Sequence, residues 1–197
     1  MWRIGITGSI ATGKSTLLAA FEKAGVPVFS ADTAVAELYA GDAIAPVEAL
    51  FPGVTQNGVI DRQRLAARLA ADPSDFKRLE AVVHPLVRAA IAGFLAAAER
   101  RGEKMAAVEV PLLFESGHDY GFDAIAITHV DEAIQRERAL ARPGMTVEKL
   151  ETILARQMPQ AEKKARADYL FDTALPRETI DAEVRALVET LKEKTRP

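Results

Sequence analysis

A short segment near the N-terminus matches the spacing of a phosphate-binding P-loop; it reads Gly8-Ser9-Ile10-Ala11-Thr12-Gly13-Lys14-Ser15. Such loops turn their backbone N–H groups inward at the start of a helix, where the helix dipole favours an anion. Lys14 adds a mobile positive charge for β- and γ-phosphates, and the Ser15 hydroxyl is placed to bind Mg²⁺. The alternative is a strand-to-helix turn with a solvated lysine. We favour nucleotide binding, because a β-prone run precedes the segment and a helical run, 15–24, follows it. The residues expected to bind the nucleotide are Gly8, Ala11, Thr12, Gly13, Lys14, Ser15 and Thr16.

Features outside the loop indicate which reaction it serves. No lysine follows Asn or Thr, so the base-reading motif of a guanine-specific switch is absent from the sequence. A hydrolytic motor usually ends its third strand with two acids, whereas this chain has only Glu109 in Val108-Glu109-Val110-Pro111. Glu109 is a candidate to hold Mg²⁺ through water, or it is simply a charge at a strand end. The missing second acid favours transfer to a bound acceptor over hydrolysis.

Three arginines form a second candidate group, in a segment with helical character. Arg138 and Arg142 are four residues apart and are expected to share one helix face with Arg136 nearby. Guanidinium groups neutralise charge on a transferring phosphoryl group, and a closing lid delivers them while excluding water. The alternative is a solvated basic face paired with Glu132 and Glu137.

The elements that must position these residues alternate between β-prone runs and helical segments, which predicts an α/β fold with a parallel sheet. The β-prone runs are apolar along most of their length, as expected for strands covered on both faces. They are Trp2–Thr7, Val26–Phe29, Met105–Val110, Asp123–His129 and Asp168–Asp172.

Two long helical segments interrupt this pattern. Residues 33–104 have almost no strand signal and are predicted to form a helical insertion. Its predicted breaks lie near Pro46 and at Phe51-Pro52-Gly53, Asn57-Gly58 and Asp72-Pro73. Residues 131–167 are predicted to form an exposed helical hairpin, broken at Arg142-Pro143-Gly144 and restarted with Thr146 as N-cap. The last segment, 178–194, is predicted to pack on the sheet through a stripe of Ile180, Val184, Leu187, Val188 and Leu191. We therefore expect a single domain, 1–197, with a core formed by 1–32, 105–130 and 168–197.

Composition excludes several classes of protein. The chain has 25 Lys and Arg against 28 Asp and Glu, so no global positive field attracts nucleic acid or anionic membrane. It has no cysteine, which agrees with a reducing compartment. No signal peptide precedes the first strand, and the longest apolar stretch, 89–98, is about half the ~20 residues that cross a bilayer. A cytoplasmic protein that binds neither nucleic acid nor membrane is expected.

Further short motifs follow one another in a specific order along nearly the whole chain. They are Ile4-Gly5-Ile6-Thr7-Gly8, Val28-Phe29-Ser30-Ala31-Asp32, Ile60-Asp61-Arg62-x-x-Leu65, Val83-His84-Pro85-Leu86-Val87-Arg88, Pro111-Leu112-Leu113-Phe114-Glu115, Gln135-x-x-Arg138-x-x-x-Arg142, Arg156-Gln157 and Ala167-Asp168. In this order and spacing the chain resembles the dephospho-coenzyme A kinase family. The resemblance implies transfer of the ATP γ-phosphoryl group, with Mg²⁺, to the ribose 3′-hydroxyl of dephospho-coenzyme A, the last step of coenzyme A synthesis. It also implies a P-loop three-layer sandwich with a five-stranded parallel sheet, a helical acceptor-binding insertion (33–104) and a helical lid (131–167).

The resemblance assigns roles to individual residues. Asp32 would contact the acceptor hydroxyl as a general base or orienting group, in agreement with its place after a parallel strand. Its alternative is to cap a helix starting near Thr33. Lys14, Asp32 and Arg138 form the expected catalytic set, with Arg142 on ATP and Ser15 and Glu109 on the metal.

The acceptor is expected to contact residues of the insertion and of the loop after the third strand. Arg62, His84 and Arg88 are the polar candidates, although His84-Pro85 equally suits a histidine at a helix break. Leu112 and Leu113 are expected to line the acceptor cleft, with core packing as the equal alternative. We expect a monomer or weak homo-oligomer.

Three departures from the family pattern affect these assignments. Ser9 and Ala11 replace loop glycines, Ser30 replaces a frequent second Asp, and Asp172-Thr173 stands where an Asn is common near the adenine. Two other functions remain open: a P-loop kinase of the nucleoside monophosphate or shikimate type with another acceptor, and a non-catalytic nucleotide-dependent binding protein.

Overall fold

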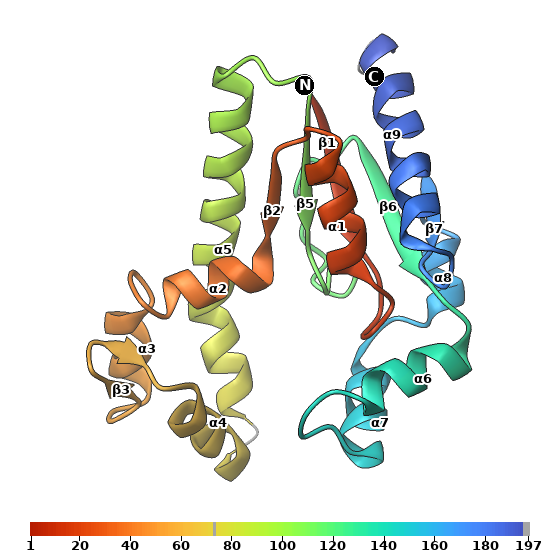
Figure 1. Cartoon of the computed structure of the whole chain (residues 1–197). Helices are drawn as coiled ribbons and strands as arrows, with labels where there is room; N and C mark the ends of the chain where they lie inside the picture. The colour runs from red at the N-terminus through yellow and green to blue at the C-terminus, as the bar shows by residue number, and fades with distance from the viewer. Residues whose placement is uncertain (73, 195–197) are drawn as a thin grey trace. The chain divides into compact units, whose positions relative to one another are not determined.

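The computed structural model describes residues 1–72 and 74–194, and it divides into two compact units. The break predicted at Asp72-Pro73 includes Pro73, which lies outside the described residues. One unit comprises residues 1–30 and those from 95 onward, and the other comprises residues 31–94. Figure 1 shows the order of the elements along the chain. The first unit contains β1 (Trp2–Thr7), α1 (Lys14–Lys23), β2 (Val28–Ser30), β5 (Met105–Glu109), β6 (Ala124–His129), α6 (Glu132–Leu140), α7 (Val147–Arg156), α8 (Gln160–Lys164), β7 (Tyr169–Asp172) and α9 (Arg177–Glu193). The second contains α2 (Ala31–Leu38), α3 (Ile44–Leu50), β3 (Thr55–Gln56), β4 (Val59–Ile60), α4 (Arg62–Ala71) and most of α5 (Asp75–Arg100).

The first unit is built on a five-stranded parallel sheet in the order β2-β5-β1-β6-β7, which confirms the predicted fold class. Every residue of β5 is buried, as the continuous apolar run in its sequence predicts. The predicted start of β2 at Val26 is wrong, and the strand begins at Val28. Pro27 accounts for the difference, because it has no N–H to donate to a ladder, although its carbonyl accepts a hydrogen bond from Ala107 N.

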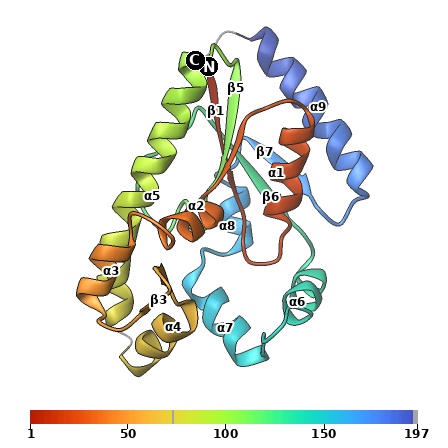
Figure 2. The same cartoon turned by 60° about the vertical axis from the view of Figure 1, so that its left-hand side comes forward.

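Helices α1 and α9 lie side by side on one face of the sheet (Figures 1 and 2). Their inward residues pack with alternate residues of the strands, including Ile4 and Ile6, in one buried cluster. The predicted stripe of α9 is confirmed, since Ile180, Val184, Val188 and Leu191 are buried and Leu187 is partly buried. The last turns of α5, from Leu95 onward, lie on the opposite face of the sheet, which completes three layers (Figure 2).

The second unit contains a small element that the sequence did not predict. Strands β3 and β4 pair antiparallel, Thr55 with Ile60 and Gln56 with Val59. Asn57 and Gly58 have φ of 51° and 76°, so this dipeptide is the turn of a hairpin and not a break between helices. The strands are only two residues long, too short to give a period-two pattern in the sequence.

Helix α5 corrects a second expectation. Pro85 lies inside this 26-residue helix, so the alternative of a helix break at His84-Pro85 is wrong.

By length and composition, α5 is also the one helix in 1–72 and 74–194 that meets the criterion for crossing a membrane, with a mean hydropathy of 1.7 over its most apolar window. Core helices of soluble proteins meet the same criterion, so this is a weak indication. Val83, Val87 and Ile91 are buried at intervals of four residues, as on the inner face of an amphipathic helix.

Candidate active site: a phosphate loop, an arginine helix and a separate cavity

The predicted phosphate loop connects β1 to the N-terminus of α1. Gly13 is its N-cap, with φ of 84° and no side-chain cap, and the first turn of α1 contains no acidic residue. The N-terminal amides and the positive end of the helix dipole are therefore available to an anion. Position 8 has room only for glycine, because a Cβ there would lie 2.6 Å from Thr12 Oγ1 and 2.8 Å from the Thr128 carbonyl oxygen.

Ala11 keeps a glycine-like backbone although it replaces a glycine of the family pattern. Its φ is 59°, in the left-handed region that L residues seldom adopt. Ser9, the other replacement, is buried, and its carbonyl accepts a hydrogen bond from Thr12 Oγ1 at 2.9 Å. Both replacements therefore fit a compact loop in which the main chain still makes the tight turns.

Lys14 lies over the phosphate loop. Its Nζ donates to the carbonyl oxygens of Gly8 and Ser9, both at 3.1 Å. Ser15 is exposed in the first turn of α1, and Thr16 beside it is half-buried. The predicted ammonium and hydroxyl are thus both at the loop, as binding of a nucleotide with its metal requires.

Glu109 and Ser30 form a polar pair at the ends of neighbouring strands. They are register partners in the β2–β5 ladder, and Ser30 Oγ donates to Glu109 Oε2 at 2.9 Å. Glu109 is buried, so Ser30 compensates part of the cost of removing this carboxylate from water. In the described part of the chain, no group of three or more His, Cys, Asp or Glu side chains is arranged to hold a metal ion. A hydroxyl and a carboxylate nevertheless suit Mg²⁺, which prefers oxygen ligands and keeps several waters.

Arg138 is held against the phosphate loop by a residue that the sequence reasoning did not select. Its guanidinium donates to Thr173 Oγ1 at 3.1 Å and to the Thr173 carbonyl oxygen at 2.9 Å. Thr173 Oγ1 in turn donates to the Thr12 carbonyl oxygen at 2.8 Å. The sequence offered two signals for Thr173: its place directly after the fifth strand, where parallel sheets bind ligands, and the departure of Asp172-Thr173 from the family pattern.

The expectation that Arg138 and Arg142 share a helix face is wrong. Helix α6 ends at Leu140, and Arg142 lies exposed in the following turn. Pro143 explains the end, because the residue before a proline is disfavoured in helical conformation, and Gly144 follows with φ of 74°. Thr146 then caps α7, as predicted, by accepting from Lys149 N at 3.3 Å.

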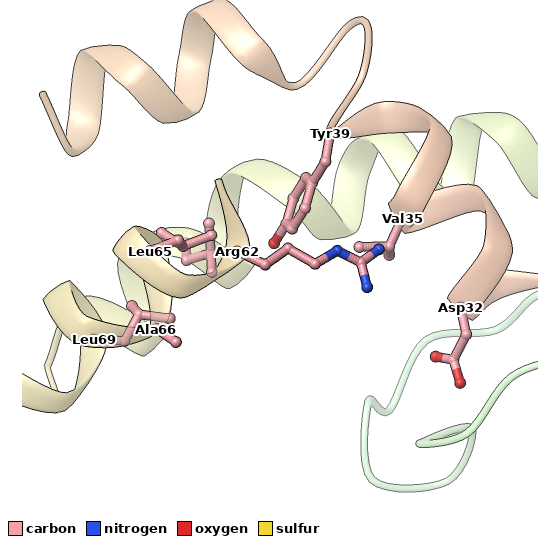
Figure 3. Close-up of a pocket in the computed structure, with 8 residues that line it drawn as sticks. Asp32, Val35, Tyr39, Arg62, Leu65, Ala66 and Leu69 are labelled. Atoms are coloured by element: carbon pink, nitrogen blue, oxygen red, sulfur yellow. The ribbon is translucent and has the colours of Figure 1, made fainter. Parts of the chain in front are cut away.

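A cavity of about 450 Å³ lies within the second unit (Figure 3). Arg62 extends from α4 toward α2, with its guanidinium carbon 5.8 Å from the centroid of the Tyr39 ring. Burial raises the pKa of the Tyr39 hydroxyl, and the charge of Arg62 partly opposes this rise. The cavity thus joins a carboxylate and a guanidinium to an apolar wall. Its lining residues are Asp32, Val35, Tyr39, Arg62, Leu65, Ala66, Leu69 and Leu79.

The other predicted acceptor residues do not line this cavity. His84 is exposed and Arg88 half-buried, one helical turn apart on α5. Leu112 is 41% exposed whereas Leu113 is 6% exposed, so the two neighbours differ in surroundings and only Leu113 packs as a core residue. Their contact with an acceptor remains a prediction.

The contact between Gly13 and Thr173 gives a first testable prediction. A Cβ at position 13 would lie 2.7–2.9 Å from three side-chain atoms of Thr173, in addition to the strain of a positive φ. We expect Gly13→Ala to lower the free energy of unfolding by at least about 2 kcal/mol and to weaken nucleotide binding. Gly25→Ala is the matched control, because its φ is 79° and a Cβ there meets no atom within 4 Å. Urea unfolding of both variants measures the difference, and equal losses would contradict the steric role of Thr173.

Comparison with known proteins identifies the family. The sequence profile described as dephospho-CoA kinase matches residues 2–175. The chain belongs to the dephospho-CoA kinase family. The dephospho-CoA kinase of Rhodopseudomonas palustris (strain BisB18) is 48% identical over 185 residues, which cover 94% of this chain and 93% of that protein. Membership of the family identifies the chain as a kinase and confirms the resemblance found in its motifs.

Solved structures agree with the fold of this family member. A crystal structure of a Thermus thermophilus protein has a TM-score of 0.79 and 34% sequence identity, and the match covers 98% of each chain. Dephospho-CoA kinase from Campylobacter jejuni has a TM-score of 0.69 at 21% identity, also over 98% of each chain. At that lower identity the likeness concerns the fold alone.

Proposed function

We propose that this dephospho-CoA kinase family member transfers the γ-phosphoryl group of ATP to the ribose 3′-hydroxyl of dephospho-coenzyme A, giving coenzyme A and ADP. The observation that carries the proposal is the phosphate loop at the start of α1, with Lys14 over its carbonyls and no acidic residue in the first helical turn. In the reaction, the acceptor oxygen forms a bond to the γ-phosphorus while the bond to the β,γ-bridging oxygen breaks. The hydroxyl proton leaves through a base, and ADP is the leaving group.

The loop provides the site for ATP. Main-chain amides at the start of α1 bind the phosphates, and Lys14 moves from the Gly8 and Ser9 carbonyls to the β- and γ-phosphates when ATP is bound. Gly8, Ala11, Thr12, Gly13, Ser15 and Thr16 complete the proposed ATP-binding set.

Ser15 and Glu109 are the residues that would hold Mg²⁺. Ser15 offers a hydroxyl directly, and Glu109 acts through water while Ser30 fixes its orientation. A bound Mg²⁺ neutralises charge on the β- and γ-phosphates. Ser30 thereby takes part of the role that a second carboxylate would have at this sheet edge.

Arg138 is proposed to stabilise the transferring phosphoryl group. Two donated hydrogen bonds fix its guanidinium at Thr173, and Thr173 binds the loop carbonyl of Thr12. A fixed guanidinium acts on developing charge without reorganisation during the reaction. Arg142, exposed in the turn after α6, is proposed to contact ATP from the lid, 131–167.

The cavity in the second unit is proposed to bind dephospho-coenzyme A. Asp32 would accept or orient the 3′-hydroxyl proton, and Arg62 would bind an anionic group of the acceptor. The Tyr39 ring and the leucines offer an apolar surface to uncharged parts of the same molecule. His84, Arg88, Leu112 and Leu113 are proposed as further acceptor contacts outside this cavity.

The protein is proposed to act in the cytoplasm as a monomer or weak homo-oligomer, without nucleic acid or membrane as partner.

Incubation of the purified chain with Mg·ATP and dephospho-coenzyme A tests the proposal. We expect mass spectrometry to detect coenzyme A and an equal amount of ADP. A dephospho-coenzyme A analogue without the 3′-hydroxyl is the control and should give no phosphorylated product. Product from shikimate or a nucleoside monophosphate, and none from dephospho-coenzyme A, would contradict the assigned acceptor. ATP binding without any phosphorylated product would favour a non-catalytic role.

A further inference from the structure

The peptide groups of Ile10, in the middle of the phosphate loop, are bound by two glutamine side chains. Ile10 N donates to Gln157 Oε1 at 2.9 Å, and the Ile10 carbonyl oxygen accepts from Gln135 Nε2 at 2.8 Å. Gln135 belongs to α6 and Gln157 is the C-cap residue of α7. Because the Ile10 N–H donates to Gln157, it is not one of the loop amides that can bind a phosphate.

A chain of amides fixes the orientation of Gln135. Val130 N donates to Gln160 Oε1 at 3.4 Å, Gln160 Nε2 donates to Gln135 Oε1 at 2.9 Å, and Gln135 Nε2 donates to the Ile10 carbonyl. Gln135 is 3% exposed, so water does not replace these partners readily. The donor of Gln135 therefore points at the loop, and a carboxylate here would place an oxygen against a carbonyl oxygen.

The Ile10 side chain is held by the same helices. Ile10 and Ala11 form a small buried cluster with Ala139 of α6 and Leu150 of α7, and Met145, Ile153 and Leu154 pack around it. A displacement of α6 or α7 thus disturbs an apolar contact and two hydrogen bonds of one loop residue.

Helix α6 is attached to the loop at a second point through Arg138. Gln135 and Arg138 are three residues apart on one face of α6. Gln135 bonds the loop directly, and Arg138 is linked to it through Thr173. Arg138 binds Thr173, and Thr173 binds the Thr12 carbonyl. These contacts form a closed ring. It runs along the loop from Ile10 to Thr12, across Thr173 to Arg138, and back along α6 to Gln135, which bonds Ile10.

We propose that Gln135 and Gln157 are positioning residues of the kinase: through the peptide groups of Ile10 they couple the phosphate loop to α6 and α7, and so hold α6 and its Arg138 in place. This inference rests on the proposed function, because Arg138 has a role only in phosphoryl transfer. Loss of either amide leaves a polar group of Ile10 without its partner. Loss of Gln135 loosens α6 directly, and loss of Gln157 loosens it through the apolar cluster that α6 shares with α7. A loosened helix also admits water beside the γ-phosphate, so that hydrolysis competes with transfer.

The test compares Gln135→Leu and Gln157→Leu, singly and combined, with the wild type. Coenzyme A formation, ADP release without acceptor, and the urea unfolding midpoint are measured for each protein. We expect kcat for coenzyme A to fall about tenfold in each single variant, with an unchanged KM for dephospho-coenzyme A. The ratio of ADP released to coenzyme A formed rises several-fold. The fold-decrease in kcat of the double variant is smaller than the product of the two single fold-decreases, because both glutamines act through Ile10. Gln56→Leu, on exposed β3, is the control and keeps wild-type values.

A purely structural role would lower both ADP release and coenzyme A formation in proportion to the folded fraction, leaving their ratio unchanged, and this result would overturn the inference. Wild-type kcat in both single variants would overturn it equally. If the wild type itself forms no coenzyme A, the proposed function fails, whereas active wild type with unaffected variants refutes the coupling alone.

Discussion

Lys14→Ala is expected to reduce coenzyme A formation about a thousandfold while the fold persists. The ammonium of Lys14 donates hydrogen bonds of 3.1 Å to two main-chain carbonyls of the loop, those of Gly8 and Ser9. Without it, charge that accumulates between the β- and γ-phosphates in the transition state loses its compensating partner. A steady-state assay with dephospho-coenzyme A, together with circular dichroism of the variant, measures activity and fold separately.

Lys192→Ala is the matched control, since Lys192 is an exposed lysine of α9. It removes the same charge and should leave kcat within about twofold, because a solvated charge remote from the site is screened. Full turnover of Lys14→Ala would contradict the assignment of the phosphate loop, and equal losses in both variants would indicate an effect of net charge alone.

Local patterns in the sequence were sufficient to predict the sheet and its phosphate loop. The stripe of α9 follows from its own periodicity, and the Thr146 cap of α7 follows from residue type and position. The predicted helix and strand boundaries were wrong where a single proline altered the local backbone. Pro27 delays the start of β2, Pro143 ends the helix before Arg142, and Pro85 is accommodated within α5.

The candidate site was predicted only where a motif specifies it. Lys14 and Ser15 lie in the loop, and Asp32 and Arg62 line one cavity. The partners that orient the site were missed, because Thr173 and Gln157 reach the loop from more than a hundred residues away in sequence and no periodicity signals such contacts. His84 and Arg88 were selected from a motif that also suits a helix surface, and the cavity does not include them.

Asp32→Asn is expected to lower kcat about a hundredfold without changing the KM for ATP. The helix that contains Asp32 begins at Ala31, so Asp32 lies in its first turn and the alternative role as cap of a helix starting near Thr33 is wrong. Its exposed carboxylate lines the cavity proposed to bind the acceptor, where it would accept the proton of the attacking hydroxyl. Asparagine keeps the shape and loses both the charge and the basic oxygen. The loss should be smaller than that of Lys14→Ala, because phosphoryl transfer depends more on charge and positioning than on proton removal.

Glu37→Gln distinguishes this role from a structural one, because Glu37 is an exposed acid of the same helix that does not line the cavity. An acid in the first turn of a helix stabilises it by about 0.3–1 kcal/mol through the dipole, so Asp32→Asn should also lower the urea midpoint slightly. If Asp32→Asn had a lower urea unfolding midpoint and an unaltered kcat, Asp32 would act only by stabilising the helix. A large drop in kcat at saturating ATP, with wild-type turnover in Glu37→Gln, would instead place the carboxylate at the acceptor hydroxyl, since neither helix stability nor net charge accounts for that difference.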